Sequence, residues 1–271
     1  MKTKDYLKLI SVFLLALIAY IPVFVWMWER WFAKESYYGH GILIPIVSLY
    51  VLWQRRERLK NIIPRRHPAG IILIGIGLFI HIICALLRIY FMSAFSFIIV
   101  FYGIVLFFLG KETARQLTFP IFFLSAMIPL PLVLIGNLTV RLKLFAAQAA
   151  AFILNRIGFP CVRDGSLIRM PASYISVGAP CSGLRSLISL LTLGVIFAQS
   201  INTSLSKKAV LFLSSVPIAI TANVARIILL AIVNDLYGQK AALGFFHDFS
   251  GFLVFVFAFL GLFYAGKILE R

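Results

Sequence analysis

Long apolar runs separated by short polar segments dominate the amino-acid sequence. A helix that spans a membrane needs about 20 apolar residues. Eight stretches approach that length, and they lie near residues 7–28, 40–54, 70–87, 89–109, 117–136, 181–199, 208–234 and 250–267. The pattern therefore predicts an all-α polytopic membrane protein with about eight transmembrane helices in a single membrane domain over residues 1–271. The first run is longer than a signal-peptide core and no small-residue cleavage site follows it, so we expect it to be retained as a span.

The segment 137–180 departs from this pattern. Its first part, "NLTVRLKLFAAQAAAFILNRIG", places apolar residues at helical spacing with polar residues between them, which is typical of an amphipathic helix at a membrane surface. Its second part, "FPCVRDGSLIRMPASYISV", places the turn-forming residues "RDGS" between two short β-prone runs, which predicts a β-hairpin. We expect 137–180 to form a small extracytoplasmic segment that leads directly into "GAPCSG" at the start of the sixth span.

The composition and the distribution of charge agree with a membrane protein. Hydrophobic residues make up 62% of the chain and charged residues 13%, against about a quarter charged in average soluble domains, and the mean hydropathy is +1.00. The chain carries 26 Lys and Arg residues against 9 Asp and Glu residues, a formal net charge of +17. No nucleic-acid-binding motif or basic groove with interleaved aromatic residues accompanies this charge, so we expect no nucleic-acid partner.

The basic residues also predict the orientation of the chain, because they accumulate in cytoplasmic loops. With the N-terminus inside, the short external loops hold only Arg30, Lys34, Arg88 and Lys240. The predicted cytoplasmic segments hold Lys2, Lys4, Lys8, Arg55, Arg56, Arg58, Lys60, Arg65, Arg66, Lys111, Arg115, Lys207, Lys208, Lys267 and Arg271. Both termini are therefore predicted to face the cytoplasm, in a multi-pass protein of the inner or plasma membrane.

The three cysteines, Cys84, Cys161 and Cys181, are too few and too scattered to indicate a disulfide scaffold or a metal cluster. We expect no metal and no cofactor. Cys84 lies in the middle of a span and is interpreted as a packing residue. Cys161 lies in the predicted extracytoplasmic hairpin, where a disulfide with Cys181 is an alternative to a free nucleophile.

Cys181 is the strongest candidate for chemistry. Pro180 suits a first helical turn, and Ser182 and Gly183 suit a helix start, which places the thiol at the external N-terminus of the sixth span. The positive end of the helix dipole favours a thiolate there, and Arg185, one turn further on, acts in the same direction. The alternative is that Cys181 is only a small hydrophobic residue at a helix end.

Arg226 is the second candidate, since it lies in the outer half of the seventh predicted span. Asn223 precedes it by three residues on the same helical face. A charge within a membrane is costly and usually faces a bundle interior or an aqueous cavity. No acidic residue lies at a matching depth in another span, so a structural ion pair has no obvious partner. The alternative is that the arginine extends to the outer interface.

Two histidines are candidate bases. His247, followed by Asp248, lies at the external start of the eighth predicted span, and His40 lies at the external start of the second. A thiol nucleophile at Cys181, an imidazole base and a fixed cation at Arg226 are the groups that acyl transfer requires. Spacing alone leaves the choice between the two histidines open, and each could also be an ordinary interfacial residue.

Several sequence blocks resemble the exosortase/archaeosortase family. "CSGLRSL" at 181–187, "ANVARI" at 222–227 and "FHDFSGFLVF" at 246–255 are similar to the three signature blocks of that family. "YYGHGILIPIVSLYVLWQRRERL" at 37–59 resembles its N-terminal block, and "RDGSLIRMPASYISV" at 163–177 fits the hairpin before the cysteine. The resemblance covers nearly the whole chain in the expected order.

The resemblance implies an integral-membrane cysteine transpeptidase or protease. By matching positions, Cys181 would be the nucleophile, Arg226 the essential arginine and His247 the catalytic histidine. Family substrates are exported proteins with a C-terminal sorting signal, which consists of a short motif such as Pro-Glu-Pro, one transmembrane helix and a basic tail. The enzyme would cut near the motif and pass the new C-terminus to an acceptor at the cell surface. Many relatives carry a glutamate and an alanine just before the cysteine, where this chain has Ala179 and Pro180.

An acidic motif would be attracted to nearby arginines, and we expect Arg163, Arg169, Arg185 or Arg226 to contact it. Two other functions remain open at this stage. One is a transporter or flippase for an anionic lipid or glycan that uses Arg226 as a substrate contact. The other is a thiol-dependent acyltransferase that acts on lipids. A transporter should tolerate the loss of the Cys181 thiol, whereas neither the transpeptidase nor the lipid acyltransferase should remain active without it.

Overall fold

A computed structural model describes residues 3–171 and 173–270 of the chain. A few side chains lie outside this description: those of Thr3, Lys4, Pro180, Leu243, Phe245, His247 and Asp248. The chain forms two compact units, Met1–Pro131 and Leu132–Arg271, and each is described by itself.

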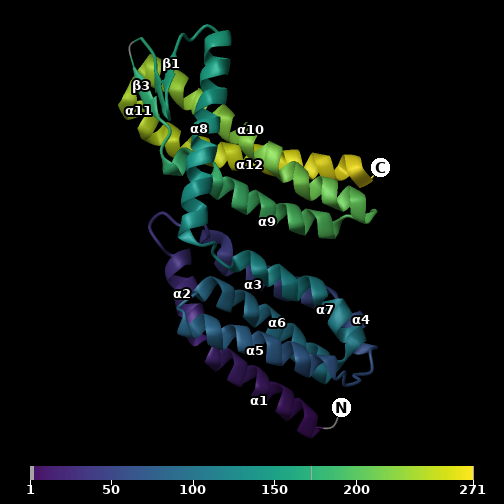
Figure 1. The fold of residues 1–271 in the computed structure, drawn as a ribbon. Coiled ribbons are helices and arrows are strands. Elements are labelled where there is room, and N and C mark those ends of the chain that lie inside the picture. Colours follow the sequence, from purple (N-terminus) through teal and green to yellow (C-terminus); the bar gives the residue numbers. More distant parts are fainter. Residues whose placement is uncertain (1–2, 172, 271) are drawn as a thin grey trace. The chain divides into compact units, whose positions relative to one another are not determined.

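The first unit is entirely helical (Figure 1). Its helices are α1 (Thr3–Ala19), α2 (Ile21–Trp31), η1 (Gly39–Ile42), α3 (Leu43–Gln54), α4 (Arg56–Lys60), α5 (Ala69–Leu86), α6 (Tyr90–Leu109), α7 (Lys111–Phe123) and η2 (Leu124–Met127). The α5–α6 hairpin packs closely, because glycines on α5 leave no side chain between the two backbones. A Cβ atom at Gly77, for example, would lie only 2.5 Å from Cγ2 of Val100. Small residues allow this close approach between membrane helices.

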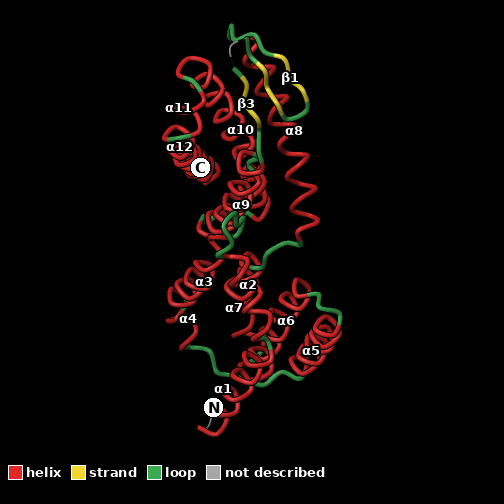
Figure 2. Tube along the Cα trace, turned by 90° about the vertical axis from the view of Figure 1, so that its left-hand side faces the viewer, coloured by secondary structure: helices red, strands yellow, loops and turns green. Residues whose placement is uncertain are grey.

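The second unit combines helices with a small sheet (Figures 1 and 2). Its elements are α8 (Leu132–Arg156), β1 (Val162–Asp164), β2 (Leu167–Arg169), β3 (Tyr174–Ser176), η3 (Ala179–Cys181), α9 (Leu184–Ser200), α10 (Leu205–Tyr237), α11 (Gln239–Leu243) and α12 (Phe245–Glu270). The three strands are antiparallel in the order β1-β2-β3. The register pairs Arg163 with Ile168 and Ile168 with Ile175. The predicted β-hairpin is therefore present and gains a third strand.

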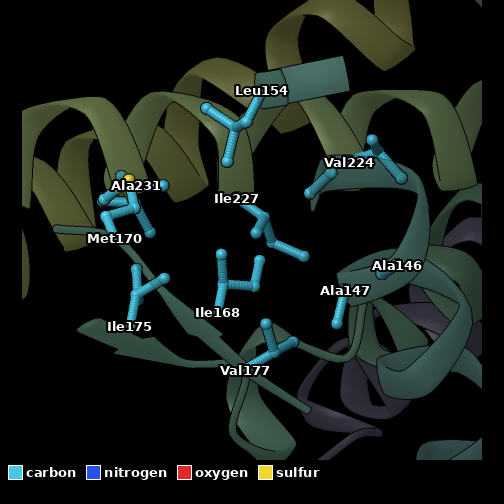
Figure 3. Packing of buried hydrophobic residues seen from close by; sticks show 12 residues of the cluster. Ala146, Ala147, Leu154, Ile168, Met170, Ile175, Val177, Val224, Ile227 and Ala231 are labelled. Carbon is cyan, nitrogen blue, oxygen red and sulfur yellow. The ribbon is translucent and has the colours of Figure 1, made fainter. Parts of the chain in front are cut away.

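An apolar cluster holds this sheet against α8 and α10 (Figure 3). Ile168 of β2 and Ile227 of α10 are fully buried in it, as is Leu154 of α8. Polar contacts add to the attachment: the side-chain amide of Asn234 on α10 donates to the carbonyl oxygen of Tyr174 at 2.8 Å. The sheet is thereby fixed to α10 only a few residues before the chain reaches Cys181.

Fewer of the described helices can span a membrane than the eight that the sequence predicts. In the described part of the chain, five helices are long and apolar enough to cross a membrane, or six if α1 and α2, bent by 58°, count as one broken span. The five are Ala69–Leu86, Tyr90–Leu109, Leu132–Arg156, Leu205–Tyr237 and Phe249–Glu270. The apolar helices at Gly39–Gln54 and Leu184–Ser200 are shorter. The chain is thus an all-α multi-pass membrane protein with a small sheet, while its orientation stays a prediction.

The predicted span over 117–136 is wrong as a continuous helix. α7 ends at Phe123, η2 follows, and Ile128 is extended before α8 begins at Leu132. Pro129 and Pro131 explain the interruption, because proline lacks the amide hydrogen that a helix interior needs and disfavours helical backbone in the preceding residue. The predicted amphipathic helix from residue 137 is part of α8, a 25-residue helix that begins five residues earlier and is itself a candidate span.

Candidate active site

Cys181 is the last residue of the short helix η3, which connects the sheet to α9. Its amide donates to the carbonyl oxygen of Gly178 at 3.1 Å. The side chain is half-buried and packs against the apolar cluster shared by the sheet, α8 and α10. Since α9 begins only at Leu184, the cysteine precedes the helix rather than forming part of its first turn.

Gly183 shapes the connection between Cys181 and α9. Its φ angle is +79°, in the left-handed region that glycine adopts without strain. A Cβ atom there would also lie 2.7 Å from Cγ of Asn223. The neighbouring Ser182 is buried, and its hydroxyl accepts a hydrogen bond from the amide of Leu184 at 3.3 Å. Ser182 and Gly183, which the sequence suggested as a helix start, therefore determine how the chain enters α9.

Asn223 joins the cysteine segment to α10. Its side-chain amide donates to the carbonyl oxygen of Cys181 at 3.0 Å, although the two residues are 42 positions apart in the sequence. Asn223 is 3% exposed, so the donor side of this hydrogen bond is buried. The bond fixes the backbone of the candidate nucleophile to a rigid helix.

Arg226 lies on α10 one helical turn beyond Asn223 and reaches α12. Its Nε donates to the hydroxyl oxygen of Ser250 at 3.2 Å. Ser250 is 1% exposed. An ideal Cβ atom on the adjacent Gly251 would be 3.5 Å from a guanidinium nitrogen of Arg226. The guanidinium is thus held between α10 and α12. Nothing in the sequence indicates that Ser250 contacts Arg226, because Ser250 is a single serine in a largely apolar run.

The electrostatic environment of the thiol differs from the expected one. Burial raises the pKa of the Cys181 thiol above its ordinary value, and the positive charge of Arg226 opposes that rise without cancelling it. The pKa shift is therefore opposite in direction to the one expected from the α9 dipole and Arg185: the thiol precedes the helix, and Arg185 is exposed on α9. The surroundings of Cys181 therefore favour the neutral thiol more than an exposed cysteine would.

A cavity of about 490 Å³ opens beside Arg226 between α10 and α12. Arg226, Ser250 and Thr221 supply the polar groups of the lining, and the rest of it is largely apolar. The apolar lining includes Ala222, Ala225, Leu253 and Phe257. We call this cavity the α10–α12 groove. It runs along α10 from Leu229, one turn beyond Arg226, to Pro217, a helical rise of about 18 Å at 1.5 Å per residue.

The two histidines differ in what the structure describes. His247 falls in the first turn of α12, on the same helix as Ser250 and three residues before it; its side chain and that of Asp248 lie outside the described residues. His40 belongs to η1 in the first unit, where its ring stacks on Tyr38 with centroids 5.9 Å apart. The choice of base therefore stays a prediction.

Two of the four arginines expected to contact an acidic motif, Arg163 and Arg169, lie on the sheet, whereas Arg185 lies on α9 and Arg226 on α10. Arg163 of β1 donates to the carbonyl oxygen of Gly165 at 2.9 Å. Arg169 of β2 forms an ion pair with Asp164 at 3.3 Å, in which both side chains are largely exposed. Both guanidinium groups are accessible at the surface of the sheet that precedes Cys181.

All three cysteines are thiols in the structure. Cys84 is buried on α5, as expected for a packing residue. Cys161 donates through its sulfur to the carbonyl oxygen of Ala151 on α8 at 3.5 Å, and burial raises its pKa. Its backbone is further held by Asn155, which accepts from the Cys161 amide at 2.8 Å. Cys161 thus has a structural attachment of its own to α8.

Taken together, the fold and the site define a multi-pass membrane protein that holds a half-buried thiol beside a helix-borne arginine. The sequence profile described as Transmembrane exosortase (Exosortase_EpsH) matches residues 26–264. The chain belongs to this exosortase family, whose members are membrane cysteine transpeptidases for C-terminal sorting signals. No curated protein and no solved structure matches the chain. Family membership favours the peptide-directed enzyme over the transporter and the lipid acyltransferase.

Proposed function

We propose that this protein cleaves the C-terminal sorting signal of exported membrane-anchored proteins through a thioester on Cys181. The observation that carries the proposal is the hydrogen bond from Asn223 to the carbonyl oxygen of Cys181. It attaches the thiol segment to α10 one turn before Arg226, and the charge of Arg226 acts on that thiol. A nucleophile and a fixed cation therefore act on the same reacting region.

The reaction follows from the chemistry of these groups. His247, with His40 as the alternative, accepts the thiol proton while the sulfur of Cys181 attacks the carbonyl carbon of the scissile peptide bond. Arg226 stabilises the negative charge on the carbonyl oxygen of the tetrahedral intermediate. The C–N bond then breaks, and the imidazolium returns its proton to the leaving amine. An acceptor amine or water resolves the thioester and restores the thiol.

The supporting residues fix this arrangement rather than react. Asn223 and Gly183 together hold the cysteine segment against α10, and Ser182 stabilises the turn into α9. Ser250 holds the guanidinium of Arg226 through their 3.2 Å hydrogen bond. Asp248, next to the candidate base, would orient its imidazole. Ala179 and Pro180 replace the acidic residue that many relatives carry, so in this chain no carboxylate at that position assists the thiol.

The α10–α12 groove supports a substrate that carries an apolar helix. It contains Arg226 and continues from there between two helices that are candidate spans. The transmembrane helix of the sorting signal would lie along this groove, with the bond to be cut next to Arg226. The motif that precedes the helix would then extend toward the sheet, where Arg163 and Arg169 are accessible to an acidic side chain. With a basic tail in the cytoplasm, cleavage occurs at the extracytoplasmic membrane surface.

The test is the processing of a C-terminally tagged substrate in cells that produce Cys181→Ala. We expect the variant to leave the tag on the substrate, whereas the matched variant Cys161→Ser removes it as the wild type does. Continued removal of the tag by Cys181→Ala would contradict the proposal. In purified protein, a substrate labelled on the N-terminal side of the cut should form an adduct with the enzyme that neutral hydroxylamine releases, as expected for a thioester.

A further inference from the structure

The first unit contains a second cavity with a lining unlike that of the α10–α12 groove. It measures about 840 Å³ and lies between the loop that connects α4 to α5 and the junction of α6 with α7. The charged residues in its lining are Arg58, Arg65, Arg66, Lys111 and Glu112. We call this cavity the basic pocket.

Close backbone packing builds the basic pocket. Gly110, at the α6–α7 junction, has a φ angle of +86°, and the carbonyl oxygen of Arg65 occupies the position that a Cβ atom on Gly110 would need. The amide of His67 donates to the carbonyl oxygen of Phe107 on α6 at 3.4 Å. These contacts hold the loop against the end of α6, so the cationic side chains project from a fixed backbone.

The positive charge in the basic pocket is only partly compensated. Arg66 forms an ion pair with Asp5 of α1. Among the described residues, no ion pair involves Arg58, Arg65 or Lys111, and Glu112 is the single carboxylate in the lining. The pKa of Arg55, at the end of α3, is lowered by burial and, to a smaller extent, by the positive charge of Arg58. The described lining of the pocket therefore carries an excess of positive charge.

The basic pocket lies at the ends of two candidate membrane spans. It adjoins the first turn of α5 and the last turn of α6, both candidate spans. Tyr50 and Trp53 are exposed near the end of α3, where aromatic side chains mark the membrane–water interface. Ile63, in the pocket lining, is 76% exposed. An exposed isoleucine among arginines suits a boundary where phosphate groups and acyl chains meet.

We propose that the basic pocket binds the phosphate headgroup of an anionic phospholipid, through Arg58, Arg65 and Lys111, while Ile63 contacts an acyl chain. Basic pockets between membrane helices at the cytoplasmic surface take anionic headgroups in this way. Arginine side chains bind phosphate oxygens through paired, charge-assisted hydrogen bonds. The inference does not depend on the proposed function, because it uses no residue of the candidate active site.

The experiment compares anionic phospholipid bound to purified variants. Wild type and the variant R58Q/R65Q/K111Q are incubated with vesicles of phosphatidylcholine and phosphatidylglycerol, re-isolated in detergent, and analysed by native mass spectrometry for bound lipid. The matched control is K207Q/K208Q/K267Q, which removes the same number of charges from the same predicted membrane face. We expect the pocket variant to lose at least about tenfold in bound phosphatidylglycerol, and the control to retain it.

Each other outcome overturns the proposal. Equal retention by both variants would show that the basic pocket is not a lipid site, and equal loss would show a general effect of surface charge. Displacement of the lipid by millimolar inorganic phosphate would identify a site for a free anion instead. Far-UV circular dichroism and gel filtration check folding. The charge-conserving variant R58K/R65K should bind less lipid than the wild type, because lysine keeps the charge but loses the paired hydrogen bonds to phosphate. It provides a reading even if the neutral variant folds poorly, and unchanged lipid binding in R58K/R65K would contradict the proposed arginine contacts.

Discussion

The side chain of Asn223 donates to the backbone carbonyl of Cys181 across 3.0 Å and thereby joins the thiol segment to α10. On the same helix, Asn234 donates to the carbonyl of Tyr174 across 2.8 Å and joins β3 to α10. Both asparagines are 3% exposed. One helix therefore holds the candidate nucleophile and the preceding sheet through two equivalent contacts, which provide a matched pair for mutation.

We expect Asn223→Ala and Asn234→Ala to lower the free energy of unfolding by similar amounts, about 1–3 kcal/mol each, because each removes a buried side chain and leaves a backbone carbonyl without its partner. Their effects on turnover should differ. Asn223→Ala should reduce kcat/KM by about 10²-fold or more, since displacement of a reacting group by about 1 Å has that effect. Asn234→Ala should change it only slightly. Denaturant unfolding and substrate cleavage assays measure the two effects, and equal losses of activity would contradict the positioning role.

The second prediction concerns the charge of Arg226. Burial raises the pKa of Cys181 and Arg226 opposes the rise, so Arg226→Gln should move the pKa further upward. The measurement is the rate of alkylation by iodoacetamide as a function of pH, in a C84A/C161S background that leaves one cysteine. The midpoint should shift to higher pH than in the parent protein. Cleavage should fall by about 10²–10³-fold, the range for loss of an oxyanion-stabilising donor.

Arg185→Gln is the control for Arg226. Arg185 is exposed on α9, which begins after the cysteine, and its charge is screened by water. The alkylation midpoint should therefore stay at the parent value. A shift as large as that of Arg226→Gln would show that Arg185 acts on the thiol after all.

Gly183 provides the third prediction. Alanine at this position must adopt a φ angle of +79° and displace the side chain of Asn223. The left-handed conformation alone costs roughly 1–2 kcal/mol, and the displaced asparagine breaks the bond to Cys181. We expect Gly183→Ala to lower both stability and cleavage.

Gly136→Ala is the matched control for Gly183→Ala. Gly136 lies inside α8, and a Cβ atom there would have nothing within 4 Å. Because alanine is the better helix former, stability should increase by about 0.5–1 kcal/mol. Thermal unfolding distinguishes the two variants by the sign of the change. A stable, active Gly183→Ala would contradict the role assigned to this turn.

Only those parts of the candidate site that lie within short, recognisable sequence motifs could be predicted from the sequence. "RDGS" between β-prone runs predicted the hairpin, and the order of "CSGLRSL" and "ANVARI" pointed to Cys181 and Arg226. Ser250 was missed, because nothing near it distinguishes a serine that contacts an arginine from one that packs. The direction of the Cys181 pKa shift is opposite to the predicted one, because residues far apart in the sequence bury the thiol and burial disfavours the charged form.

The limits of the fold prediction have a similar cause. The hydropathy of the apolar run 117–136 is the same whether these residues form one continuous helix or two separate ones. The break at Pro129 and Pro131 decides between them. Likewise, polar residues such as Arg141 suggested a surface helix from residue 137, whereas α8 is continuous from Leu132. Helical periodicity indicates which residues are helical, but the depth of a helix in the membrane depends on its neighbours.

The fourth prediction concerns the α10–α12 groove. Ala225 is exposed and lines the groove one residue before Arg226. The variant Ala225→Trp should therefore fill part of the groove without disturbing the packed interior of the protein. If a substrate helix lies there, KM should rise by about tenfold while kcat changes less, because bound substrate and transition state lose the same contact. Ala209→Trp, exposed on α10 away from the groove, should leave both parameters unchanged. An unaltered KM in Ala225→Trp would place the substrate helix elsewhere.

The last prediction separates the two candidate bases. Because burial keeps the pKa of Cys181 above its ordinary value, little thiolate forms at neutral pH without a proton acceptor. A variant without that acceptor should lose about 10²–10⁴-fold in kcat/KM near neutral pH. The loss should become smaller as pH rises, since hydroxide then ionises the thiol directly. We expect this profile for His247→Gln and an unchanged profile for His40→Gln. The reverse result would assign the base to His40, and a pH-independent loss in both variants would show that neither imidazole accepts the thiol proton.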